Sequence, residues 1–225
     1  MGRKVGMLHG TEQRIVRGAR RGFTLIELLA VLVIIGILAT FLIPNILGTF
    51  DTAEVTACNA NMREIHKGLL IYQQKYKRVP TESGSRFLAE LYAKAAVDRT
   101  KSGAMRLTCP AVDVGALTQT ALGLEPTEWF EDVEAVNGGF TTYAARDCEH
   151  HPLRKYPIGG EPIVADDNDG GMNHDTTTNV LYGDGTVETY EVFELRDEGL
   201  LGPDEELLLV GPDSPVEELR KLSLD

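Results

Sequence analysis

The 225-residue sequence predicts an α+β protein in which one long N-terminal helix packs on a small antiparallel sheet. An apolar helical segment that begins at Phe23 is followed by an amphipathic helical pattern that reaches Tyr76, and short strand-like segments joined by turn signals come after it. Helix first and antiparallel strands afterwards are typical of the α+β class. The formal net charge of −12 disfavours a nucleic-acid partner, because phosphate binding needs a basic surface.

The charges are sorted along the chain. Residues 1–22 contain six basic residues and one acidic residue, whereas residues 23–225 carry a net charge of −17. No charged residue occurs from Leu28 to Phe50, a run longer than the ~20 residues that a helix needs to cross a bilayer. The basic flank predicts a cytoplasmic N-terminus and an exported acidic part. A cleaved secretory signal and a plain uncleaved anchor are the alternatives.

Glu27 is the unusual residue of the apolar segment, where it is flanked on both sides by apolar residues. A carboxylate in a membrane span is costly and by default indicates a function, unless it lies close enough to the surface to stay hydrated. Cutting the chain after Gly22 would create an α-ammonium on Phe23. That charge could pair with Glu27 of a neighbouring chain.

Residues 20–29, Arg-Arg-Gly-Phe-Thr-Leu-Ile-Glu-Leu-Leu, resemble the class III signal of type IV pilins and type II secretion pseudopilins. The resemblance implies that a prepilin peptidase cleaves after Gly22 and N-methylates Phe23. It also implies that Glu27 sets the register between subunits in a filament. The leader has 22 residues, or 16 if Met7 is the true start.

The resemblance implies a structural subunit and not an enzyme, with a pilin-like fold. The favoured role is that of a type II secretion pseudopilin in protein export. A type IV pilin for adhesion, motility or DNA uptake is the alternative, and a membrane-anchored periplasmic binding protein or enzyme is the competing class. The implied partners are the prepilin peptidase, further subunits joined head-to-tail, the inner-membrane assembly platform and membrane lipid. The protein is then a single-pass inner-membrane protein with a periplasmic C-terminal domain, and its filament lies in the periplasm or at the cell surface.

Four regions are expected along the chain: a leader (1–22), a transmembrane and filament-core helix (23–50), a periplasmic head that includes the second half of the helix (51–193), and an acidic C-terminal tail (194–225). Pro44 predicts a kink in the helix, because proline removes a hydrogen bond and clashes with the preceding turn. An apolar stripe with a period near 3.5 predicts the face that docks on the head. Its members are Val55, Cys58, Met62, Ile65, Leu69, Tyr72 and Tyr76.

The helix should end at Val79-Pro80, and Ser85 could cap a short helix after it. Strands are expected near residues 107–110, 140–145 and 162–165. Asp184-Gly185 between strand-like segments predicts a hairpin with a two-residue turn. The tail is expected to be partly helical over residues 203–208 and 215–222.

Two groups of residues outside the N-terminal segment are candidate sites. His174 and Asp184-Gly185 resemble the His-x9-Asp-Gly motif of a pseudopilin-like group common in planctomycete-type bacteria. The pair is either a catalytic base with its orienting carboxylate, or a loop histidine and a turn aspartate that fix the hairpin. Asp166, Asp167 and Asp169 offer oxygen ligands for calcium, with a solvated acidic turn as the alternative.

The three cysteines are too few for a disulfide scaffold and too scattered for a structural zinc site. Cys109 and Cys148 fall in the exported part, where they could form a disulfide or remain two unpaired thiols. Cys58 lies on the helix stripe and is interpreted as a small core residue. No cofactor is expected to be required, and calcium is the one candidate.

Overall fold

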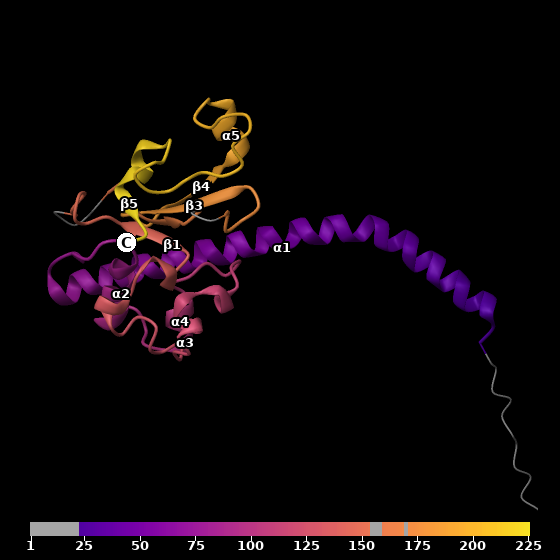
Figure 1. Ribbon diagram of the computed structural model, residues 1–225, viewed down its shortest axis with the longest axis horizontal. Helices are drawn as coiled ribbons and strands as arrows, with labels where there is room; N and C mark the ends of the chain where they lie inside the picture. The colour runs from indigo at the N-terminus through magenta and orange to yellow at the C-terminus, as the bar shows by residue number, and fades with distance from the viewer. Residues whose placement is uncertain (1–22, 154–158, 169–170) are drawn as a thin grey trace, which may run out of the picture. The chain divides into compact units, whose positions relative to one another are not determined.

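The computed structural model describes residues 23–153, 159–168 and 171–225, and for residues 41–51 the description covers the helical backbone alone (Figure 1). The chain divides into two compact units, Met1–Asn45 and Ile46–Asp225. The predicted α+β class is confirmed, since helices accompany a five-stranded antiparallel sheet. The expected leader, 1–22, lies outside the described residues.

Helix α1 (Leu25–Tyr76) has 52 residues, close to the predicted range. Its predicted apolar stripe is confirmed from Cys58 to Tyr76, whereas Val55, the first predicted member, is half-buried and outside the core. Five stripe residues are buried in the head, and they are Cys58, Met62, Ile65, Leu69 and Tyr72. Tyr76 packs against the same core while partly exposed.

The predicted membrane span, residues 23–50, lies mostly in the first unit of the chain. Within the described residues, no helix has both the length and the apolar character that crossing a membrane requires. The predicted span extends over residues 41–50, whose side chains are not described. The kink predicted at Pro44 falls in the same stretch and stays a prediction.

Short helices and turns connect α1 to the sheet. Helix α2 (Gly84–Ala93) begins after Ser83, so the predicted cap at Ser85 is wrong and that residue is buried inside the helix. The following helices are α3 (Lys101–Met105) and α4 (Thr118–Ala121), with 3-10 turns at Val114–Ala116, Val133–Ala135 and Gly138–Phe140. Residues 107–110 form a turn and a loop after α3, where a strand was expected.

The sheet has the strand order β4-β3-β2-β1-β5, and all neighbours are antiparallel. Its strands are β1 (Tyr143–Arg146), β2 (Pro162–Asp166), β3 (Thr177–Tyr182), β4 (Val187–Glu191) and β5 (Leu222–Ser223). The predicted hairpin is confirmed, because β3 and β4 pair on either side of Asp184-Gly185. Strands β1 to β3 are buried along their length, whereas β4 at the edge is partly exposed.

Each face of the sheet packs on its own apolar core. One core joins α1 and α2 to side chains such as Tyr143 and Leu181. The other core joins side chains such as Ala144 and Val180 to α5 (Val192–Asp197) and the C-terminal segment. Figure 1 shows α2 on one side of the sheet and α5 with the C-terminal segment on the other.

The C-terminal segment differs from the expected acidic tail. Residues 194–225 are part of the head, because their apolar side chains are buried in the second core and their end supplies strand β5. The buried residues are Leu195, Leu201, Leu208, Val216, Leu219 and Leu222. A 3-10 helix, Glu217–Lys221, precedes β5, while residues 203–208 contain turns and irregular chain where helix was expected. Acidic residues lie between these apolar residues in the sequence, so the segment did not show the periodic apolar pattern of a buried element.

Candidate functional site

Glu27, the N-terminal candidate carboxylate, forms a local motif with Thr24 at the start of α1. Thr24 precedes the first helical residue, Leu25. The Glu27 carboxylate accepts hydrogen bonds from the Thr24 amide, 2.8 Å away, and from the Thr24 hydroxyl, 2.7 Å away. The Glu27 amide in turn donates to the Thr24 hydroxyl oxygen at 3.3 Å. This reciprocal arrangement is a capping box, which satisfies donors that a helix start leaves without partners.

The capping box lies at one end of a strongly apolar helical surface. Large apolar side chains from Phe23 to Leu38 are exposed on the isolated chain. Burying such a surface is worth roughly 25 cal/mol per Å² of apolar area, so it favours contact with lipid or with other apolar helices. Glu27 is the one acidic residue in this stretch. Gly22, the predicted cleavage residue, lies outside the described residues.

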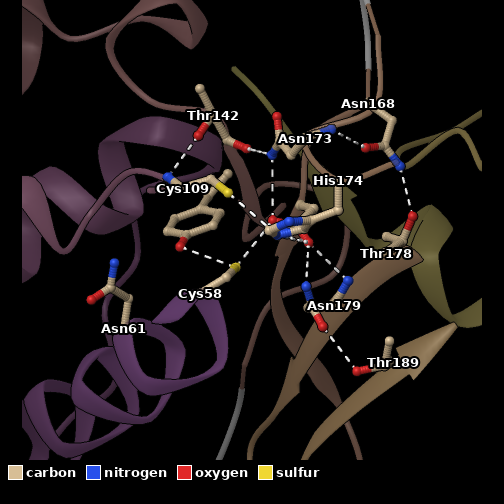
Figure 2. A network of polar contacts seen from close by, with 12 residues as sticks. Cys58, Asn61, Cys109, Thr142, Asn168, Asn173, His174, Thr178, Asn179 and Thr189 are labelled. Carbon is tan, nitrogen blue, oxygen red and sulfur yellow. Dashed lines mark hydrogen bonds and ion pairs between the residues drawn. The ribbon is translucent and has the colours of Figure 1, made fainter. Parts of the chain in front are cut away.

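A second group of polar side chains is buried in the head, between α1 and the sheet. Cys58 comes from α1, Cys109 from the loop after α3, Asp166 from the end of β2, and His174 from the loop before β3. Figure 2 shows the Cys58 and Cys109 side chains pointing toward the ring of His174. We call these four residues the buried cluster, and all four are buried.

The contacts in the buried cluster are short. The Cys109 sulfur lies 3.4 Å from His174 Nε2, and His174 Nε2 lies 3.7 Å from an Asp166 carboxylate oxygen. The Cys58 thiol donates to the other Asp166 oxygen at 3.3 Å and lies 3.3 Å from the Tyr143 hydroxyl. Thiol hydrogen bonds are weak. This network therefore offsets only a modest part of the free-energy cost of burying these polar groups.

Neighbouring groups separate the acidities of the two thiols. The adjacent Cys58 thiol is the main cause that lowers the pKa of Cys109 to about 7; burial opposes this effect and the hydrogen bond with His174 supports it. The contact with Cys109, then burial and the Asp166 charge, raise the pKa of Cys58. Burial first, and then the two thiols, raise the pKa of the Tyr143 hydroxyl. Cys109 is therefore the thiol that gives up its proton more readily.

Comparison with known proteins bears on the N-terminal motif. Residues 17–43 match the family model described as the prokaryotic N-terminal methylation motif. The matched range includes Gly22, Phe23 and Glu27 of this chain. The chain therefore carries this methylation motif. This result supports the resemblance to pilins and pseudopilins seen in the sequence.

Curated relatives share a limited part of the chain. The type II secretion system core protein G of Klebsiella michiganensis is 37% identical over 65 residues, which are 29% of this chain and 46% of that protein. The core protein G of Pseudomonas aeruginosa is 39% identical over 57 residues, 25% of this chain and 40% of that protein. That of Vibrio cholerae is 37% identical over 60 residues, 27% of this chain and 41% of that protein. The chain thus spans less than half the length of these relatives, and no solved structure matches it.

The residues of the His-x9-Asp-Gly motif lie in two different parts of the head, the turn between β3 and β4 and the buried cluster. The Asp184 carboxylate accepts from the Thr186 amide and hydroxyl, at 2.9 and 2.6 Å, within the turn between β3 and β4. Gly185 has a φ of +90° and lies against the ring of His66 on α1. Asp184 therefore fixes the hairpin turn, as one of the two interpretations expected. His174 instead belongs to the buried cluster, so the contacts of the two residues do not favour a catalytic pair.

The expected calcium loop is also divided. The Asp166 carboxylate faces the interior, where one oxygen accepts from the Asn179 amide at 2.8 Å and from its side chain at 2.9 Å. Asp167 is half-buried, and its amide donates to the Thr142 carbonyl. Asp169 lies outside the described residues. The Asp166 carboxylate already accepts hydrogen bonds from Asn179. Calcium binding by this loop stays a prediction.

Of the two alternatives for Cys109 and Cys148, the structure has the two unpaired thiols, since all three cysteines are free and buried. Cys148 donates to the Pro80 carbonyl oxygen at 3.7 Å, whereas Cys109 lies against His174. Both cysteines are buried in the core on the α1 side of the sheet. Sequence reasoning missed the proximity of Cys58 and Cys109, which no local spacing signals because they are 51 positions apart.

Proposed function

We propose that this chain is a pseudopilin, a subunit of a pilus-like filament of the type II secretion kind, which acts in protein export. The observation that carries the proposal is the placement of Glu27. It lies in the first turn of an exposed apolar helix, inside the methylation motif and five positions after Gly22. A prepilin peptidase then cleaves after Gly22 and methylates Phe23. The curated relatives named core protein G favour secretion over the alternative of a type IV pilin.

Assembly follows from the same residues. Identical subunits that repeat head-to-tail make a heterologous contact that does not close on itself. The apolar stems pack together in the filament and against lipid before assembly. An unpaired Glu27 carboxylate or Phe23 ammonium in that interior would cost several kcal/mol. Pairing the two charges between neighbours offsets both costs and fixes the axial register.

The proposal includes the setting and the partners. The basic residues before the apolar segment keep the N-terminus in the cytoplasm, and the head lies in the periplasm. The partners are the prepilin peptidase, further pilin or pseudopilin subunits, and the assembly platform in the inner membrane. The role is structural and not enzymatic. The contacts of His174 with the buried cluster, and of Asp184 with its own turn, support this view.

The test is the N-terminus of the protein extracted from membranes, measured by mass spectrometry. We expect a chain that begins at Phe23 and carries one methyl group. The Gly22→Leu variant should keep its leader, because a peptidase that accepts a small residue at the cut cannot seat a large side chain. Gly18→Leu, which places the same side chain elsewhere in the leader, is the matched control and should be cleaved. An intact leader in mature wild-type protein would overturn the proposal.

A further inference from the structure

The buried cluster gathers four metal-ligating side chains that the proposed function does not use. The sulfur atoms of Cys58 and Cys109, a carboxylate oxygen of Asp166 and a ring nitrogen of His174 all lie within 4.8 Å of one another. The four residues come from one helix, one strand end and two loops. We propose that the buried cluster binds one zinc ion and is a structural metal site of the head.

The distances suit a tetrahedral ion. Zinc binds sulfur at about 2.3 Å and nitrogen or oxygen at about 2.0–2.2 Å, so neighbouring ligand atoms in a tetrahedron are roughly 3.3–3.8 Å apart. The Cys109 sulfur and His174 Nε2 are 3.4 Å apart, and the Cys58 sulfur and an Asp166 oxygen are 3.3 Å apart. His174 Nε2 and Asp166 are separated by 3.7 Å. Each of these three distances has the length of a tetrahedral edge, although the Cys58 contact is with Asp166 Oδ1 and the His174 contact is with Oδ2, and only one of these oxygens would bind the ion.

The chemistry of the donors selects the metal class. Two thiols and one imidazole suit zinc, whereas calcium and magnesium prefer ligand sets made of oxygen. Four protein ligands, all buried, match a closed structural site and not a catalytic site, which keeps one position open for water. On binding, both cysteines release their protons to solvent, and the metal takes the place of the Cys58 hydrogen bond to Asp166.

A second layer of contacts holds the carboxylate in place. Asn179 donates its amide and its side chain to one Asp166 oxygen, at 2.8 and 2.9 Å. Asn173 donates its side chain to the other oxygen at 3.3 Å. The Asn179 side chain is itself held by the Thr189 hydroxyl at 2.9 Å, and Figure 2 shows Thr189 below it. Outer partners of this kind orient metal ligands, which makes Asn179 a positioning residue of the site.

The position of the site gives it a structural role. Cys58 lies in the part of α1 that packs on the head, and the other ligands lie on the sheet and its neighbouring loops. An ion bound to all four residues would tie α1 to three separate segments of the head. Because binding occurs in the folded state, zinc should raise the stability of the head.

The experiment uses the full chain, purified in detergent with a reductant, stripped with a chelator and then loaded with zinc or cobalt. We expect about one zinc per chain by elemental analysis, a rise in the midpoint of thermal unfolding with zinc, and a thiolate-to-cobalt absorption band. Cys109→Ser should lose the band and the zinc. Cys148→Ser is the matched control, because Cys148 is also a buried free thiol but lies outside the buried cluster, and it should keep both.

Asn179→Ala tests the outer layer and should weaken zinc affinity by about 10–100-fold while leaving one site per chain. Circular dichroism checks that each variant is folded. If Cys109→Ser does not fold, the presence or absence of the cobalt band in the wild-type chain tests the proposal. A reduced wild-type chain that takes up no zinc, or that gives no thiolate band with cobalt, would overturn the proposal. So would zinc retained by a folded Cys109→Ser chain, or a Cys58–Cys109 disulfide whose reduction does not restore zinc binding.

Discussion

Replacing the buried Glu90 by alanine should destabilise the head far more than removing an exposed charge does. Glu90 is buried on α2, and its carboxylate receives four hydrogen bonds. The donors are the Tyr72 hydroxyl, the Arg78 guanidinium at 3.0 Å, and the Thr81 and Glu82 amides at 3.0 and 3.4 Å. The residue thus joins the end of α1 to the turn that follows it and to α2.

The magnitude follows from these partners. Removing one member of a buried ion pair costs about 3–5 kcal/mol, because the other groups keep their desolvation cost without their partner. The Arg78 side chain is 47% exposed, so its share is small and the total should lie near the lower limit, about 3 kcal/mol. For a unit of this size, that cost lowers the unfolding midpoint by roughly 6–12 °C.

The assay is thermal unfolding of the full chain in detergent, followed by circular dichroism. Glu131→Ala is the control, because it breaks an ion pair with Arg99 in which both side chains are about half exposed, and it should cost about 1 kcal/mol or less. An unfolding midpoint for Glu90→Ala equal to that of Glu131→Ala would refute the reasoning.

The same residue gives a dependence on pH. Burial alone would raise the pKa of Glu90, but the hydrogen bond from Tyr72, the two amides and the Arg78 charge hold it below its ordinary value of 4.5. The charged carboxylate therefore stabilises the fold above about pH 4.5, and this contribution is lost as the pH falls through the lowered pKa. The stability difference between wild type and Glu90→Gln should shrink below pH 4.5. A constant difference down to pH 3 would contradict this assignment.

Two further predictions concern packing, and both are measured by thermal unfolding. Leu219→Ala should cost about 2–5 kcal/mol because Leu219 is fully buried in the second core, whereas Leu209→Ala, at an exposed position, should cost about 0.5 kcal/mol or less. Equal effects would show that the C-terminal segment is not part of the head. Gly185→Ala should cost more than about 1 kcal/mol, since its φ is +90° and a Cβ atom would lie 2.7 Å from the His66 ring. Gly160→Ala, where a Cβ atom meets open space, should be neutral, and an equal loss there would contradict the argument.

The sequence predicts well what depends on local pattern. The stripe from Cys58 to Tyr72 predicts the buried face of α1 because a helix repeats its faces every 3.6 residues. Asp184-Gly185 predicts its hairpin because the turn needs a positive φ, which glycine adopts easily. The start of α1 is likewise local, since Thr24 and Glu27 are three positions apart.

Features that depend on distant contacts were missed. Strand β5 has two residues, and they pair with β1 residues 76 and 78 positions away, so no periodicity marks the strand. The buried cluster likewise needs four segments to meet, and Cys58 taken alone has the pattern of a core residue. The sequence could not decide between a Cys109–Cys148 bridge and two unpaired thiols for the same reason, because the partners of a cysteine depend on how distant loops fold together.

The measurement that tests the proposed filament most directly compares two variants at the start of α1 with a control variant farther along the helix. Glu27→Leu removes the carboxylate, Thr24→Val removes one of its capping donors and keeps the charge, and Glu64→Gln changes an exposed carboxylate far along α1. Each is expressed beside wild type, and sheared filaments, the membrane fraction and the N-terminus are measured.

The account predicts that Glu27→Leu abolishes or strongly reduces filaments while cleavage and membrane insertion persist, because the Phe23 ammonium of the neighbouring subunit loses its partner. Thr24→Val and Glu64→Gln should still assemble. A normal filament yield from cleaved Glu27→Leu protein would contradict the account. An equal loss of filaments in Thr24→Val would show that the carboxylate acts through the helix cap and not through pairing between subunits.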